Sequence, residues 1–131
     1  MKRCAQLLLA LAVAGTLAAP AAAQGTIQRN FPRNALRGTI VFGNPPQIQL
    51  NGQSTNLAAA YRVHGLNNLI VMSTQLAGGS FIVDYTTDVQ GQVYEVWLLS
   101  AAEADRLPWP ATPAQAAAWT FDPIAQTWTK P

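Results

Sequence analysis

The sequence contains few side chains suited to reactive chemistry. Its 131 residues include one cysteine, one histidine and two methionines. Cys4 and Met1 both fall in the first 23 residues, which leaves His64 and Met72 for the rest of the chain. Zinc and copper sites draw on several His, Cys or Met ligands. We therefore expect no metal and no other cofactor, and we expect Met72 to be a core residue.

Long apolar runs are also missing, apart from one near the start. Residues 7–19 are uncharged and mostly apolar, but this run is shorter than the ~20 residues that a membrane-spanning helix needs. Lys2 and Arg3 precede it, and an A-x-A cleavage signal ends at Ala23. These are the parts of a secretory signal peptide. The sequence predicts cleavage between Ala23 and Gln24, a periplasmic or secreted location, and no membrane span after cleavage.

The mature chain has no excess charge of either sign. Without Lys2 and Arg3, six of the eight basic residues remain, against six acidic residues. A net positive charge would favour nucleic acids or anionic membranes, so we expect no nucleic-acid partner. Loss of Cys4 also leaves a chain without disulfides, and its fold must depend on packing.

Short alternating apolar runs separated by turn residues extend from Leu36 to Leu99. Asn51-Gly52 is a strong hairpin signal, and residues 88–91 resemble a four-residue hairpin loop. Residues 69–72 are expected to form one of the short strands. Six or seven antiparallel strands with no helix between them predict a mainly β fold, a small barrel of the OB or SH3 type. The expected core includes Phe81, Val83, Tyr85, Val93 and Trp97.

The last third of the chain changes character. Ser100 with Glu103, and Thr112 with Gln115, have the spacing of helix capping boxes, and Pro113 occupies a favoured first helical position. Residues 119–129 alternate around Asp122-Pro123, which favours a terminal hairpin. The predicted organisation is a signal peptide (1–23), a β-barrel domain (24–99) and a Trp- and Pro-rich tail of short helices and a hairpin (100–131) packed on the barrel.

Two resemblances concern parts of this pattern. Phe121-Asp122-Pro123, followed by Trp128, resembles the inter-strand turn of a kelch repeat, which implies only the local hairpin. The mature chain also resembles an uncharacterised family of short exported bacterial β-rich proteins. The shared features are a Pro-Pro and Asn-Gly β segment, a Val-Trp-Leu-Leu-like strand and a Trp-Thr-Lys-Pro-like end. This second resemblance implies export and a common fold, and no chemistry.

Catalytic residues are difficult to assemble from this composition. A Ser-His-acid arrangement would have to use His64, and no serine lies in a G-x-S-x-G frame. We interpret His64 as a polar residue that pairs with Arg62 on the outward face of a strand. We therefore expect no enzymatic activity, with a small periplasmic hydrolase that uses His64 as an alternative.

The charged residues are segregated along the sequence. Four arginines precede every acidic residue of the mature chain: Arg29, Arg33, Arg37 and Arg62. One interpretation is that these arginines meet acids of the second half across neighbouring strands. The other is an arginine patch that docks an anionic partner, such as a cell-wall polymer or an acidic protein face.

All four tryptophans lie in the last third, and three follow the barrel segment. Trp109, Trp119 and Trp128 either tie the tail to the barrel or form an aromatic surface for a peptide or glycan. Trp109 lies between two prolines, which keep its backbone out of a helix or sheet ladder. If the tail binds a ligand, Trp109 is therefore the best candidate, because its ring would be rigidly presented.

The leading hypothesis is an exported, non-enzymatic binding module of the cell envelope. Its candidate partners are an envelope protein, a peptide or a glycan. Besides the hydrolase, a structural subunit of an envelope assembly is an alternative, and such a subunit would expose a contiguous apolar patch.

Overall fold

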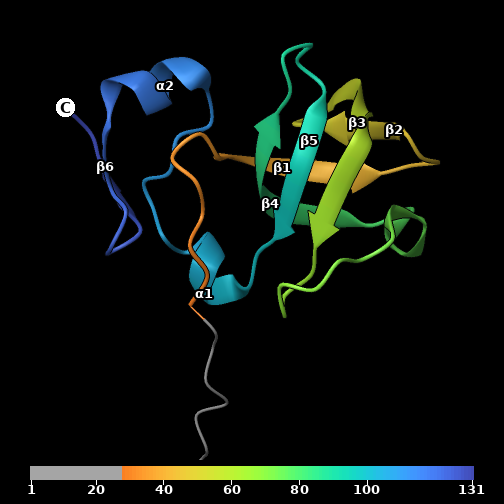
Figure 1. Cartoon of the computed structure of the whole chain (residues 1–131), viewed down its shortest axis with the longest axis horizontal. Coiled ribbons are helices and arrows are strands. Elements are labelled where there is room, and N and C mark those ends of the chain that lie inside the picture. Colours follow the sequence, from red (N-terminus) through yellow and green to blue (C-terminus); the bar gives the residue numbers. More distant parts are fainter. Residues whose placement is uncertain (1–27) are drawn as a thin grey trace, which may run out of the picture.

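The computed structural model describes residues 28–131, so the predicted signal peptide and its cleavage site at Ala23 and Gln24 lie outside the described residues. Figure 1 shows a barrel on one side and a tail of short elements on the other. The elements are β1 (Leu36–Phe42), β2 (Gln47–Leu50), β3 (Gln53–His64), η1 (Ser73–Leu76), β4 (Ser80–Thr87), β5 (Val93–Leu98), α1 (Ala101–Ala104), α2 (Pro113–Ala118), β6 (Thr120–Asp122) and β7 (Thr127–Thr129).

The described chain forms a closed barrel in the strand order β1-β2-β3-β5-β4, with β4 returning to β1. Neighbouring strands are antiparallel except β3 and β5, which are parallel. This order, with one parallel pair, is that of an OB-fold barrel. The predicted fold class, a small β barrel with two short C-terminal helices, is therefore confirmed.

The barrel differs from the prediction in strand number and direction. Its five strands within the described residues are fewer than the six or seven expected, because residues 53–64 form one long strand that contacts β2 along its first part and β5 along its second. The predicted strand at residues 69–72 is wrong. This segment forms only an isolated bridge between Ile70 and His64 before η1 begins.

The predicted hairpin turn and the first capping box agree with the structure, and the second capping box forms only in part. Asn51 and Gly52 have φ angles of 52° and 82°, the left-handed geometry that a tight hairpin requires. Ser100 and Glu103 form a complete capping box at α1. At α2 the Thr112 hydroxyl accepts from the Gln115 amide, but the Gln115 side chain accepts from the Ala111 amide rather than from Thr112.

Apolar residues fill the inside of the barrel. This core contains Leu36, Ile40, Phe42, Ile48, Leu57, Val63, Val83, Tyr85, Val93, Val96 and Leu98, with Phe81 partly buried against it. Trp97 is also buried, but the prediction that it belongs to the barrel core is wrong. Its side chain points outward and packs in a second cluster with Phe31, Ala35, Trp109 and Trp128.

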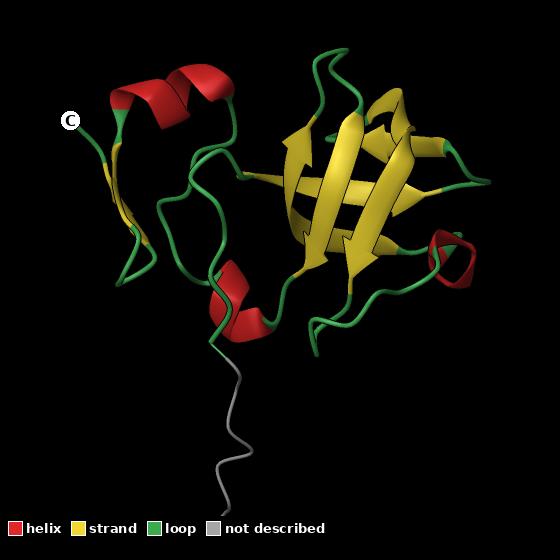
Figure 2. Cartoon of the chain, in the orientation of Figure 1, coloured by secondary structure: helices red, strands yellow, loops and turns green. Residues whose placement is uncertain are grey.

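The second cluster forms where the tail covers the outer face of the barrel. In the strand register Arg37 of β1 pairs with Asp84 of β4, Asp84 with Trp97 of β5, and Trp97 with His64 of β3. These four residues form one row across the outside of four strands. Figure 2 shows the helices and the β6–β7 hairpin beside the barrel and not within it. The predicted docking of the tail and its terminal hairpin is therefore present.

Candidate functional site

The predicted arginine patch does not form on the surface. Arg29 is 4% exposed and pairs with Glu103, while Arg37 is largely buried and pairs with Asp84. Arg33 and Arg62 are exposed. Arg29 and Arg37 are thus buried in ion pairs with acidic residues of the second half of the chain. For these two arginines the structure agrees with the interpretation that they pair with acids, and not with an exposed patch.

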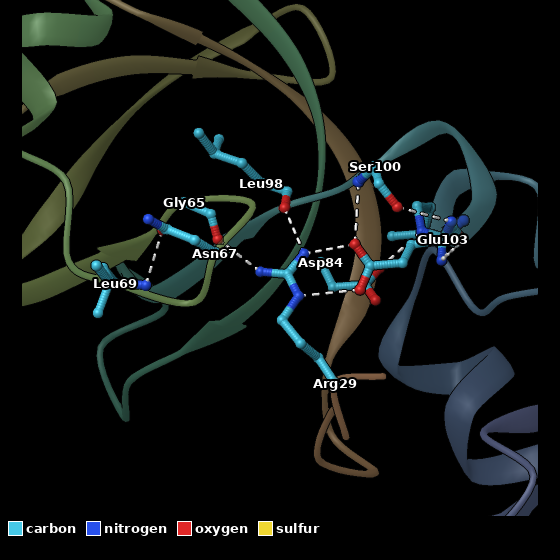
Figure 3. A network of polar contacts seen from close by, with 9 residues as sticks. Arg29, Gly65, Asn67, Leu69, Asp84, Leu98, Ser100 and Glu103 are labelled. Atoms are coloured by element: carbon cyan, nitrogen blue, oxygen red, sulfur yellow. Dashed lines mark hydrogen bonds and ion pairs between the residues drawn. The ribbon is translucent and has the colours of Figure 1, made fainter. Parts of the chain in front are cut away.

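Arg29 uses its whole guanidinium group in one buried network (Figure 3). Its Nε and Nη2 donate to the two carboxylate oxygens of Glu103 at 2.9 and 2.6 Å. Its Nη1 donates to the Gly65 carbonyl at 2.8 Å, and Nη2 also donates to the Leu98 carbonyl at 2.6 Å. Burial alone would raise the pKa of Glu103, but hydrogen bonds from Arg29 and Ser100 outweigh it and lower the pKa. The network joins the N-terminal segment, the ends of β3 and β5, and α1.

Arg37 and Asp84 form a second buried ion pair beside the first. Arg37 Nε donates to Asp84 Oδ1 at 2.6 Å, and its other nitrogens donate to the carbonyls of Ala104 and Glu103. Asp84 is fully buried, and its Oδ2 has no hydrogen-bond partner among the described residues. Burial raises the pKa of Asp84 to about 6, and the interaction with Arg37 offsets only part of this effect.

Trp109 packs between the tail and the barrel, which agrees with the first interpretation of the tail tryptophans and contradicts the presented ring of the second. Trp109 is 5% exposed, and its indole nitrogen donates to the Ala35 carbonyl at 3.0 Å. Its ring lies edge-on to Phe31 and Trp128, and the Arg37 guanidinium lies 5.0 Å from its centre. The flanking prolines keep the backbone of Trp109 from forming the hydrogen bonds of a β-sheet, but they do not prevent its ring from packing between the barrel and the tail.

The other two tail tryptophans are also engaged in packing. Trp128 is 3% exposed and lies against Phe121, with ring centres 4.8 Å apart. Trp119 is partly exposed, and the Lys130 ammonium lies 5.4 Å from its ring. An aromatic surface built from Trp109 and Trp128 is therefore absent from the described part of the chain.

His64 does not pair with Arg62 as predicted. Its Nε2 lies 2.8 Å from Glu95 Oε1, and its ring stacks on Trp97 at 5.4 Å. Its Nδ1 lies 3.5 Å from the Asn68 carbonyl. These contacts position the ring between two strands, and within residues 28–131 no serine hydroxyl is among its hydrogen-bond partners.

An open groove crosses the outer face of β1, β2 and β3. The register places Val41, Gln49 and Ser54 in one row across the three strands. The next row contains Gln47 and Asn56, with Gly43 just after the end of β1. The groove has a volume of about 470 Å³. Sequence reasoning missed this site, although the alternation of Gln47 and Gln49 with Ile48 and Leu50 indicated a polar outer face.

The groove is polar and uncharged. Its exposed side chains are Gln47, Gln49, Ser54 and Asn56. Each side-chain amide offers two hydrogen-bond donors and one acceptor oxygen, and the serine hydroxyl can both donate and accept a hydrogen bond. Val41 adds apolar surface between them. This arrangement can exchange hydrogen bonds with a neutral ligand that carries many hydroxyl or amide groups.

A second exposed feature is the loop between β3 and η1. Leu66, Leu69, Ile70 and Met72 are each 62–66% exposed. The expectation that Met72 is a core residue is therefore wrong, because the segment leaves the barrel after the bridge at Ile70 instead of entering it as a strand. We call these four residues the apolar loop.

No protein-family model matches this chain, and neither does any curated protein or solved structure. Among residues 28–131, no group of three or more His, Cys, Asp or Glu side chains is arranged to hold a metal ion. No helix in that range is long and apolar enough to span a membrane.

Proposed function

We propose that this protein is an exported, non-enzymatic binding module that takes an uncharged glycan in the groove across β1, β2 and β3. The observation that carries the proposal is the pair of cross-strand rows that expose Gln47, Gln49, Ser54 and Asn56 around about 470 Å³ of open volume. The position of the groove in the fold and the chemistry of its side chains both support this proposal.

The fold supports the choice of face. In OB-fold proteins, the face of the second and third strands and the adjoining loops bind oligonucleotides and oligosaccharides. The groove lies on that face, beside the loop between β1 and β2. The likeness to OB-fold proteins is at the level of the fold alone. It supports the location of the site, and the ligand class depends on the side chains.

The side chains favour a glycan over an oligonucleotide. Among the described residues that line the groove, none is an arginine or lysine to meet phosphates, and none has an aromatic ring on which bases could stack. Amide and hydroxyl groups are instead suited to the hydroxyls of sugars, which donate and accept hydrogen bonds. The apolar surface of Val41 can contact the carbon face of a sugar ring.

A structural subunit of an envelope assembly is a second candidate, favoured by the apolar loop. Four large apolar side chains exposed within seven residues are unusual on a monomer surface and are typical of protein interfaces. A double substitution, Leu69→Ser with Ile70→Ser, would test this role by co-purification from envelope extract. Loss of a co-purified partner would support it, and unchanged recovery would contradict it.

Equilibrium titration tests the glycan proposal. The probes are tetrasaccharides of N-acetylglucosamine and of glucose, each added to the purified protein in a calorimeter. We expect saturable binding of at least one probe and a loss of about tenfold in affinity for Gln49→Ala or Asn56→Ala, the effect expected from losing one or two hydrogen bonds.

A matched control separates the groove from the general surface. Gln75 is an exposed glutamine of η1 outside the groove, so Gln75→Ala should bind as the unsubstituted protein does. Binding that is equally weakened by all three substitutions, or absent for every probe, would contradict the proposal.

A further inference from the structure

Two open hollows share Arg33 as a lining residue, and both lie apart from the groove across β1, β2 and β3. Arg33 belongs to the segment before β1, which Figure 1 shows in orange between the barrel and the tail. The larger hollow has a volume of about 560 Å³ and lies between residues 30–33 and the terminal hairpin. The smaller has a volume of about 360 Å³ and lies between Arg33, Asn34 and helix α2.

The walls of both hollows are mainly apolar. Pro32 and Pro123 line the larger one and are exposed, and the half-buried Phe121 lies beside them. The Phe121 ring packs on Trp128, with ring centres 4.8 Å apart, so its position is fixed by the tail. Since burial of apolar surface favours binding, this hollow is suited to an apolar side chain of a ligand.

Arg33 supplies the charge of the two hollows. Its side chain is exposed. The three ion pairs among the described residues involve Arg29, Arg37 and His64, and Arg33 takes part in none of them. The guanidinium is therefore free to pair with an anion, and the flexible stem of an arginine lets its charged end move to meet one.

No acidic residue balances this charge from the walls. Among the described residues that line the two hollows, none is Asp or Glu. Asp122 lies between Phe121 and Pro123 in the sequence, but its Oδ1 accepts from the amides of its own turn, at Ile124 and Ala125. An apolar surface with one uncompensated positive charge is complementary to a ligand that has an apolar group beside a single negative charge.

We propose that the two hollows bind an acidic peptide segment of a partner protein. An apolar side chain of the peptide enters the larger hollow, and a neighbouring carboxylate accepts hydrogen bonds from Arg33, whose fork-shaped guanidinium suits a carboxylate. Asn30 and Asn34 are exposed, and each lines one of the hollows. Their amides can donate to and accept from a peptide backbone. An anionic membrane is less suited, because it is recognised by clusters of basic residues and these hollows contain one.

The test follows backbone amides by two-dimensional nitrogen-15 NMR during titration of the purified protein. The probe is the tetrapeptide Ala-Phe-Asp-Ala, acetylated and amidated so that its ends carry no charge. Ala-Phe-Asn-Ala removes the charge, and Ala-Ala-Asp-Ala removes the apolar side chain. We expect saturable shifts at Arg33, Asn34 and Phe121, and an affinity for each control peptide that is lower by about tenfold. Sodium chloride should weaken binding of the acidic peptide, since salt screens exposed charges.

Two pairs of variants locate the site. Arg33→Gln should lower the affinity for the acidic peptide about tenfold, whereas Arg62→Gln, at an exposed arginine outside both hollows, should not change it. Ala117→Glu places a negative charge in the smaller hollow and should weaken binding by a similar factor. Ala114→Glu is its matched control, because Ala114 is an exposed residue of the same helix outside both hollows.

Several results would overturn the proposal. They are the absence of a saturable shift, equal affinity for the Asp and Asn peptides, and unchanged binding in Arg33→Gln. Vesicles of phosphatidylglycerol form a further arm, and shifts at the hollows with these vesicles but not with the peptide would identify a lipid surface instead. The peptide comparisons use the unsubstituted protein, so they decide the question even if a variant fails to fold. The groove has no part in this proposal, which stands or fails separately from glycan binding.

Discussion

Arg29 and Glu103 are 74 positions apart in the sequence, yet they form a doubly hydrogen-bonded ion pair with side chains only 3% and 8% exposed. Arg29 precedes the first barrel strand, and Glu103 belongs to the capping box that starts α1 after the last one. The pair therefore fastens the two segments that flank the barrel to each other and, through the Gly65 and Leu98 carbonyls, to the barrel itself.

Removing one partner of this pair should be strongly destabilising. Arg29→Met leaves the Glu103 carboxylate buried without its partner, and such changes cost ~3–5 kcal/mol. Urea unfolding measures the free energy of unfolding directly. Arg62→Met, at an exposed arginine, is the matched control and should change it by less than about 0.5 kcal/mol. If Arg29→Met lowered the free energy of unfolding by an equally small amount, the buried network would not stabilise the contact between the tail and the barrel.

Trp109→Ala should also destabilise the protein. The substitution empties a buried aromatic site and leaves the Ala35 carbonyl without its donor, so we expect a loss of ~3–5 kcal/mol. Trp119→Ala removes a more exposed ring and should cost less. Thermal unfolding of the two variants in parallel checks the order. An unchanged melting temperature in Trp109→Ala would contradict the buried position of this ring.

Asp84 should make stability depend on pH. Its pKa is about 6 in the folded protein and near 3.8 in the unfolded chain, so the folded state binds the proton more tightly. The resulting stabilisation is complete below pH 3.8 and is lost as the pH rises through 6, a change of about 3 kcal/mol. The lowered pKa of Glu103 acts in the opposite direction, since its contribution is lost as the pH falls.

The difference between the unsubstituted protein and Asp84→Asn isolates the Asp84 contribution, because Glu103 is present in both. Unfolding free energies measured at intervals from about pH 4 to about pH 7 should show the unsubstituted protein losing stability relative to the variant as the pH rises. A difference that stays constant over this range would show that Asp84 keeps an ordinary pKa.

Export makes a prediction about the N-terminus. If residues 1–23 are a cleaved signal peptide, protein recovered from the cell envelope should begin at Gln24 or within a residue or two of it. Intact-mass measurement of the recovered protein decides this. Retention of Met1 would contradict cleavage.

Local sequence signals predicted the barrel, its hairpins and its helix caps because each depends on residues close together in the chain. Asn51-Gly52 and the Ser100–Glu103 box are examples. The location of Trp109 depended on Phe31, Ala35 and Arg37, which lie far away in sequence. Neighbouring prolines restrict a backbone, but burial is decided by what the rest of the chain places against the side chain.

The predictions about the candidate site were wrong where they depended on contacts between residues that are distant in the sequence. Charge segregation in the sequence allowed two interpretations, and only the strand register shows that Arg37 lies opposite Asp84. The apolar run at residues 69–72 had the composition of a strand, but only the bridge at Ile70 pairs with the barrel. The groove was missed because its rows combine three strands, and no single segment contains them.

The most direct test of the account is a map of ligand contacts on the protein by NMR. Backbone and side-chain amide signals are followed during titration with the tetrasaccharide that binds best. The account predicts that the largest shifts fall on the side-chain amides of Gln47, Gln49 and Asn56 and on their neighbours in β2 and β3. Shifts centred instead on the apolar loop or on the tail, with the groove signals unmoved, would contradict it.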